Sequence, residues 1–185
     1  MTRASVRNVV LTGFMGTGKT TVGKLVAREL GWTFVDTDDV IVSRHGPIEA
    51  IFAEHGEEAF RALEREVAVE AAAGQHQVVA TGGRMLLDPA NAEAMSATGR
   101  VFCLDADVDE IVRRLESDVD GPVRPLLAGS NPAAAVARLL NERADGYGRF
   151  EQVHTAGRSP QVIAADIISR LHHSPASRGD RSRPS

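Results

Sequence analysis

A glycine-rich segment carries the clearest chemistry in this sequence. GFMGTGKT, residues 13–20, matches the pattern G-x-x-x-x-G-K-[ST] and stands between an apolar β-type run and a segment of helical periodicity. Glycines let backbone N–H groups wrap around an anion, and the start of the following helix adds a favourable dipole. We expect Lys19 to reach the β- and γ-phosphates of a nucleoside triphosphate and Thr20 to place its hydroxyl on Mg²⁺. The residues predicted to bind the nucleotide are Gly13, Gly16, Thr17, Gly18, Lys19, Thr20 and Thr21.

A group of carboxylates follows a second apolar run. The sequence FVDTDD places Asp36, Asp38 and Asp39 there, and strand alternation would face Asp36 and Asp38 the same way. Beside a metal–triphosphate, one carboxylate would support Mg²⁺ and the other would accept hydrogen bonds, or a proton, from an attacking hydroxyl. The alternative is that aspartates cap a short helix that begins here, and we assign Asp39 to that role.

Arg61 is ambiguous from sequence alone. It lies in EEAFRALEREV, where the apolar stripe of Phe60, Leu63 and Val67 predicts a helix. An arginine on such a helix is more often at the surface than in a binding site. The other charged residues of the segment are predicted to form a solvated, salt-bridged face: Glu57, Glu58, Glu64, Arg65 and Glu66.

Arg143 has a more specific position. It follows Val136, Leu139 and Leu140 at helical spacing, so its side chain should turn toward the interior. An inward arginine needs an anionic partner or backbone carbonyls. Glycines flank Tyr147 in DGYGRF, which predicts a looser end to this helix.

The elements that must position these residues alternate between short β-branched runs and longer helical segments. This alternation predicts an α/β domain with a five-stranded parallel sheet, in which ligands bind beyond the carboxyl ends of the strands. The predicted strands are 6–11, 33–36, 77–80, 100–105 and 152–155. Apolar stripes predict helices at 22–30, 60–67, 108–115, 136–140 and 163–171.

Length and composition indicate one ordinary globular domain over residues 1–173. A net charge of −4 gives no reason to expect nucleic acid or an anionic membrane as a partner. The sequence has no apolar run long enough to span a bilayer and no secretory leader, so we expect a cytoplasmic protein. The single cysteine, Cys103, lies in an apolar strand and is expected to be buried and structural.

Two segments have the composition of mobile chain. Residues 117–132 combine glycines, prolines and polar residues around Arg124, which is typical either of a lid that closes over a phosphate or of a plain surface loop. Residues 174–185 contain almost no apolar side chains and are expected to be disordered.

Taken together, these motifs resemble the shikimate kinase family, from about Val9 to Leu171. The matching elements are GFMGTGKTT, the DTD of residues 36–38, IFAEHGEEAFRALE, the TGG of residues 81–83, RPLL and ERADGY. The resemblance implies a P-loop NTPase-type three-layer fold with a mobile lid. It also implies ATP-dependent phosphorylation of the 3-hydroxyl of shikimate, with ATP and Mg²⁺ as cofactors and a monomeric protein.

The resemblance also implies roles for individual residues. Asp36, with Thr20, would serve the magnesium ion, and Arg124 would be a lid arginine that contacts the phosphates of ATP. The residues implied to bind shikimate are Asp38, Arg61, Gly82, Gly83 and Arg143. The residues implied to be catalytic are Lys19, Asp38 and Arg124.

Arg84 departs from the family pattern, which usually has a third glycine at this position. If that glycine needs a positive φ, an arginine costs on the order of 1 kcal/mol in strain. Its side chain could point away to solvent or a carboxylate, add an anion contact that widens the choice of acceptor, or spoil the site. Two alternatives therefore stay open: a kinase for a related polyhydroxy acid of the quinate or gluconate type, and a nucleotide-binding regulatory protein without turnover.

Overall fold

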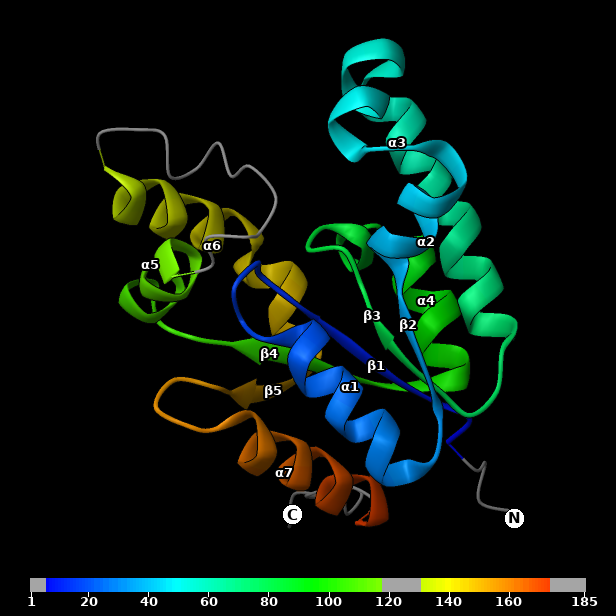
Figure 1. The fold of residues 1–185 in the computed structure, drawn as a ribbon, viewed down its shortest axis with the longest axis vertical. Helices are drawn as coiled ribbons and strands as arrows, with labels where there is room; N and C mark the ends of the chain where they lie inside the picture. Colours follow the sequence, from blue (N-terminus) through cyan, green and yellow to red (C-terminus); the bar gives the residue numbers. More distant parts are fainter. Residues whose placement is uncertain (1–5, 118–130, 174–185) are drawn as a thin grey trace, which may run out of the picture.

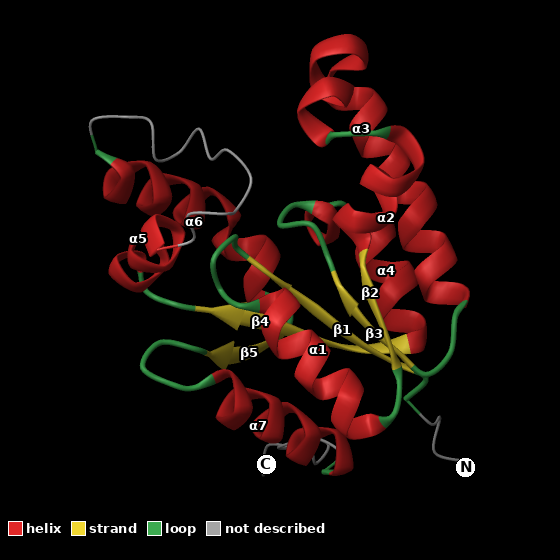
Figure 2. Cartoon of the chain, viewed as in Figure 1, coloured by secondary structure: helices red, strands yellow, loops and turns green. Residues whose placement is uncertain are grey.

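A computed structural model describes residues 6–117 and 131–173, which form a parallel sheet covered by helices on both faces (Figures 1 and 2). The strand order is β2-β3-β1-β4-β5. The strands are β1 (Asn8–Gly13), β2 (Thr33–Asp36), β3 (Gln77–Ala80), β4 (Gly99–Asp105) and β5 (Glu151–His154). The predicted α/β three-layer fold with five parallel strands is confirmed, and no predicted strand end is more than two residues from the observed one.

The helices include two that the apolar pattern did not indicate. These are α2 (Thr37–His45), which is short and charged, and α4 (Pro89–Thr98), whose alanine-rich sequence has no clear apolar stripe. The remaining helices are α1 (Lys19–Leu30), α3 (Ile48–Ala73), α5 (Val108–Ser117), α6 (Pro132–Gly148) and α7 (Pro160–His172), with a short 3₁₀ turn η1 (Met85–Leu87).

The sheet is buried on both faces, as the continuous apolar strands require. Successive residues of β1 belong to opposite sides. Val9 and Leu11 pack with α1 and α7, whereas Val10 packs with α2, α3 and α4. In Figure 1, α1 and α7 lie on one face, and α5 and α6 stand together beyond the ends of β4 and β5.

Strand register brings the predicted site segments together. Leu11 of β1 and Asp36 of β2 both pair with Ala80 of β3, so these three neighbouring strands end at nearly the same level. The glycine-rich loop, the start of α2 and the segment after β3 therefore emerge side by side.

Cys103, the predicted lid and the predicted tail are the remaining features for which the sequence made a prediction. Cys103 is buried, and burial raises the pKa of its thiol to about 12, as expected for a structural cysteine. Residues 118–130 of the predicted lid, Arg124 among them, and the predicted tail 174–185 lie outside the described residues. Within the described ranges, no helix is both long and apolar enough to cross a bilayer.

Candidate active site

The glycine-rich loop connects β1 to α1 and has the backbone geometry of an anion cradle. Three of its glycines have positive φ angles: Gly13 at 130°, Gly16 at 76° and Gly18 at 97°. A Cβ atom on Gly13 would lie 2.2 Å from the carbonyl oxygen of Leu104, so no larger residue fits there. The buried Thr17 closes the loop by donating its hydroxyl to the carbonyl of Phe14 at 2.8 Å.

Lys19 begins α1 and folds back over this loop. Its ammonium group donates to the carbonyl oxygens of Gly13 and Phe14, both at 2.9 Å. Burial lowers the pKa of Lys19 to about 8, although the nearby charges of Asp38 and Asp36 oppose this effect. A lysine that is partly desolvated beside an anion cradle is well suited to pair with phosphate oxygens.

Thr20 and Asp36 lie together beside the loop. The Thr20 hydroxyl donates to Asp36 Oδ2 at 2.8 Å, and Asp36 Oδ1 accepts the backbone N–H of Asp38 at 3.1 Å. Asp36 is therefore the N-cap of α2. The prediction that Asp39 caps this helix was wrong, because Asp36 at the end of β2 already caps it and Asp39 lies within its first turn.

This pair fits a magnesium site of the type found with nucleotides. Mg²⁺ in such sites takes one or two protein oxygens and completes its shell with phosphate oxygens and water. In the parts of the chain that the structure describes, no cluster of three or more His, Cys, Asp or Glu side chains could hold a metal by itself. The Thr20 hydroxyl directs its proton toward Asp36, so its oxygen keeps lone pairs for a metal.

Asp38 approaches the site from the first turn of α2 and not, as strand alternation predicted, from β2. Burial raises the pKa of its carboxyl to about 6, and the charge of Asp36 adds to this effect while Lys19 opposes it. A carboxylate in this environment gains from hydrogen-bond donors such as the hydroxyls of a substrate. Asp38 is thus available both to bind an alcohol and to accept its proton.

The segment after β3 lies between the carboxylates of Asp38 and Glu64 and the glycine-rich loop of residues 13–20, the P-loop. A Cβ atom on Gly82 would lie 2.6 Å from Asp38 Oδ1 and 3.2 Å from Glu64 Oε1. A Cβ atom on Gly83 would lie 3.6 Å from the Gly13 carbonyl oxygen and 3.9 Å from Arg143 Nη1. The backbone at residues 82–83 is thus bare where it meets the groups predicted to bind phosphate and acceptor.

Arg143 points inward, as its position in the apolar stripe predicts. Its side chain is half-buried, with its ζ-carbon 5.1 Å from the centre of the Phe14 ring. Both glycines that flank Tyr147 lie within α6, which continues to Gly148 and buries Tyr147. The Tyr147 hydroxyl donates to the carbonyl of Gly83 at 2.5 Å, which ties α6 to the glycine segment.

Arg61 stands between two glutamates of its own helix. Its Nε and Nη2 atoms donate to Glu57 Oε1 at 3.3 and 3.1 Å, and its Nη1 atom donates to Glu64 Oε2. Glu64 is only 2% exposed, so its assignment to a solvated face was wrong. The spacing of Phe60, Glu64 and Val67 places all three on the buried face, and this signal could have been read from the sequence.

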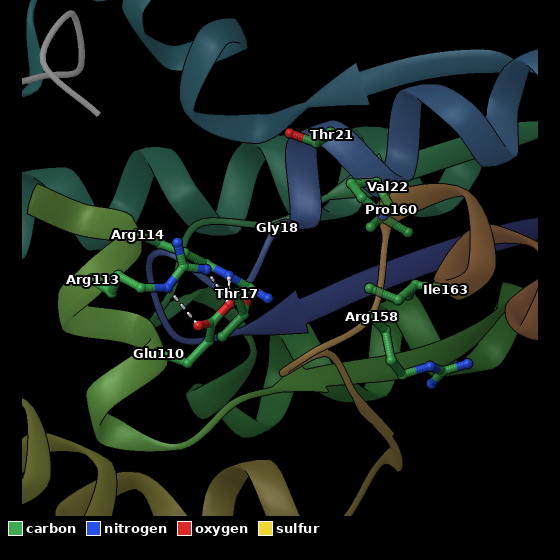
Figure 3. A pocket seen from close by; sticks show the side chains of 10 residues that line it. All are labelled: Thr17, Gly18, Thr21, Val22, Glu110, Arg113, Arg114, Arg158, Pro160 and Ile163. Atoms are coloured by element: carbon green, nitrogen blue, oxygen red, sulfur yellow. Dashed lines mark hydrogen bonds and ion pairs between the residues drawn. The ribbon is translucent and has the colours of Figure 1, made fainter. Parts of the chain in front are cut away.

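A separate pocket opens on the other side of the P-loop, between α5 and the segment before α7 (Figure 3). Arg114 anchors this corner: it donates to the Gly16 carbonyl at 3.3 Å and to the hydroxyl and carbonyl oxygens of Thr155, both at 3.0 Å. The sequence offered no specific signal for Arg114. The lining residues are Thr17, Gly18, Thr21, Val22, Glu110, Arg113, Arg114, Arg158, Pro160 and Ile163.

Comparison with known proteins agrees with this geometry. The sequence model of the family described as shikimate kinase matches residues 15–172. The chain belongs to the shikimate kinase family. A shikimate kinase from Geobacter metallireducens is 41% identical over 170 residues, which cover 91% of this chain and 93% of that relative. The activity is that of a small-molecule kinase that uses ATP to phosphorylate shikimate.

Solved structures support the same assignment. The shikimate kinase from Acinetobacter baumannii, in complex with shikimate, superposes with a TM-score of 0.82 at 32% identity and covers 91% of this chain and 94% of its own. A gluconokinase from Sinorhizobium meliloti has a TM-score of 0.63 at 18% identity, covering 92% of this chain and 94% of its own. At 18% identity this likeness shows a shared fold alone, and it says nothing about the acceptor of this chain.

Arg84, where shikimate kinases usually have glycine, is accommodated without strain. Its φ of −110° and ψ of −9° lie in the right-handed region, so this position does not need a glycine. The side chain pairs with Glu57, whose Oε1 atom lies 2.9 Å from Arg84 Nη1. Among the interpretations of Arg84, the structure agrees with a side chain that turns to a carboxylate.

Proposed function

We propose that the chain transfers the γ-phosphoryl group of ATP to the 3-hydroxyl of shikimate at the carboxyl ends of β1, β2 and β3. One observation carries the placement of this site. The two glycines after β3 lie against the P-loop and Arg143 on one side and against Asp38 and Glu64 on the other. A phosphate-binding loop and a site with both carboxylate and arginine side chains therefore share one bare stretch of backbone.

The acceptor would be held at its two ends by groups of opposite charge. Arg61 and Arg143 offer guanidinium groups that match a planar carboxylate, and this pairing is charge-assisted. Asp38 would accept hydrogen bonds from the ring hydroxyls, and it would take up the proton of the 3-hydroxyl as the new phosphate ester forms. Gly82 and Gly83 would present backbone groups to the same molecule.

The donor would lie along the P-loop. Thr20 would ligate Mg²⁺ and Asp36 would hold the Thr20 hydroxyl, while the metal would neutralise phosphate charge when it is bound. Lys19 would pair with the β- and γ-phosphates. The pocket of Figure 3 adjoins Thr17 and Gly18 and would take the base of the nucleotide. Arg124, the implied lid arginine, lies outside the described residues, and its role rests on the family resemblance.

Acceptor specificity is the most direct test of this proposal. ADP release would be measured with shikimate, quinate and gluconate as alternative acceptors, each with MgATP. We expect rapid release with shikimate alone. A preference for another acid would point to a different acceptor, and tight ATP binding without acceptor-dependent ADP would identify a nucleotide-binding protein without turnover.

Arg143→Ala should chiefly weaken the binding of shikimate. Hydrogen bonds to charged groups contribute about 1.5–3 kcal/mol, so we expect KM for shikimate to rise about tenfold to a hundredfold while KM for ATP changes little. Arg138→Ala is the matched control, because Arg138 lies on the same helix and pairs with Glu142 at 2.7 Å on the exposed side. Equal effects of the two substitutions on KM for shikimate would contradict the assignment of Arg143.

A further inference from the structure

Arg84 joins two parts of the acceptor site that are distant in sequence. It begins the turn after the glycine segment, and its partner Glu57 lies 27 residues earlier, in α3. Glu57 directly follows Gly56, whose φ of 79° and ψ of 176° interrupt the helix. The ion pair thus fastens the glycine segment to the start of the helical stretch that carries Arg61.

Glu57 uses a single oxygen for both arginines. The Oε1 atom accepts from Arg61 Nε and Nη2, and also from Arg84 Nη1 at 2.9 Å. Without Arg84, the half-exposed side chain of Glu57 would keep only its hydrogen bonds from Arg61 among the described residues. A third donor on the same oxygen fixes where that oxygen lies, and hence the orientation of the Arg61 plane.

The N–H groups that Arg61 retains show why its orientation matters. A guanidinium group has five N–H donors, and three of those of Arg61 are occupied by Glu57 and Glu64. The two that remain belong one to each terminal nitrogen, and N–H groups on two neighbouring nitrogens can bind a carboxylate in bidentate fashion. A rotation of the Arg61 plane would misdirect both.

We propose that Arg84 is a positioning residue for the acceptor: through Glu57 it orients Arg61 for the carboxylate of shikimate. This inference rests on the proposed function and extends it to a residue at which the chain departs from its family. A direct contact between Arg84 and the acceptor is the competing explanation, since Arg61 and Arg84 both line a pocket beside Asn91.

The test is a double-mutant cycle with Arg84→Ala and Glu57→Ala. An exposed ion pair contributes up to about 1 kcal/mol, so Arg84→Ala should raise KM for shikimate about two- to fivefold, leave kcat nearly unchanged and have less effect at high salt. In the Glu57→Ala background, Arg84→Ala should cause no further rise. Arg84→Lys should restore the parental KM, because only one N–H of Arg84 contacts Glu57.

Controls separate this inference from the proposed function and from folding. Arg44→Ala removes a bidentate pair with Glu70 on the same helix α3, at 2.7 and 2.9 Å, and should leave KM unchanged. Thermal unfolding would establish that each variant is folded. Additive effects of the two substitutions, or an unchanged KM in Arg84→Ala, would overturn the inference while the parent still phosphorylates shikimate. A parent without shikimate-dependent turnover would overturn the proposed function and this inference with it.

Discussion

Replacement of Lys19 by alanine is expected to lower kcat by at least about a thousandfold, because in the proposed function the lysine would stabilise charge that develops on the phosphates during transfer. The protein should remain folded, since the hydrogen bonds of the Lys19 ammonium group among the described residues go to two backbone carbonyl groups of the glycine-rich loop. ADP release under saturating shikimate and ATP would measure the loss. Turnover at the parental rate would contradict the assignment of the P-loop.

Lys24→Ala is the matched control for this substitution. Lys24 lies on the exposed side of the same helix, above the ring of Phe34, and should be dispensable for turnover.

The pKa of Lys19 gives a second readout that does not need catalysis. Because burial lowers this pKa to about 8 and bound phosphates would raise it, ATP binding near pH 8 should take up a proton in the parent and not in Lys19→Ala. Calorimetry in buffers of different ionisation enthalpy would detect the difference.

The fold and the P-loop were predictable because their signals are local and repetitive. Buried parallel strands appear as short apolar runs, and the glycine pattern is fixed by backbone geometry that few other residues can adopt. The helices that were missed lack such signals. The sequence of α4 is rich in alanine and buries Asn91, which donates to the Met85 carbonyl, so its inner face does not appear as an apolar stripe.

The proposed acceptor site was harder to predict because the placement of its residues depends on tertiary contacts. Whether the run of aspartates belongs to a strand or a helix depends on Asp36, whose carboxylate caps α2 and turns Asp38 onto a helix. Glu64 is charged and yet buried, because Arg61 pairs with it. Burial raises the pKa of Glu64 and the ion pair opposes this effect, a balance that residue type alone does not reveal. Arg84 is similar, since its partner is 27 residues away.

Asp38→Asn is expected to make the protein less active and more stable at the same time. Loss of the carboxylate should lower kcat/KM for shikimate about a hundredfold to ten-thousandfold, because asparagine cannot accept the proton of the hydroxyl. The folded state raises the pKa of Asp38 to about 6 from an ordinary value of 3.8, so the ionised carboxylate is less favourable in the folded than in the unfolded chain. This cost is fully present above about pH 6 and is relieved as the pH falls toward 4.

Asparagine at position 38 removes this unfavourable buried charge, so the folded state should gain stability at neutral pH. At pH 7.5, Asp38→Asn should raise the free energy of unfolding by about 1–2 kcal/mol, or the melting temperature by about 3–6 °C, and the gain should shrink as the pH is lowered below about 6. In the parent, kcat/KM should fall over the same pH range as Asp38 becomes protonated. Asp39→Asn, a change at the exposed neighbouring residue, should produce neither effect. If Asp38→Asn were less stable than the parent at pH 7.5, the carboxylate would support the fold, which would contradict this prediction. A variant that is more stable and inactive would show that the proposed acceptor site holds a charge that folding disfavours and catalysis needs.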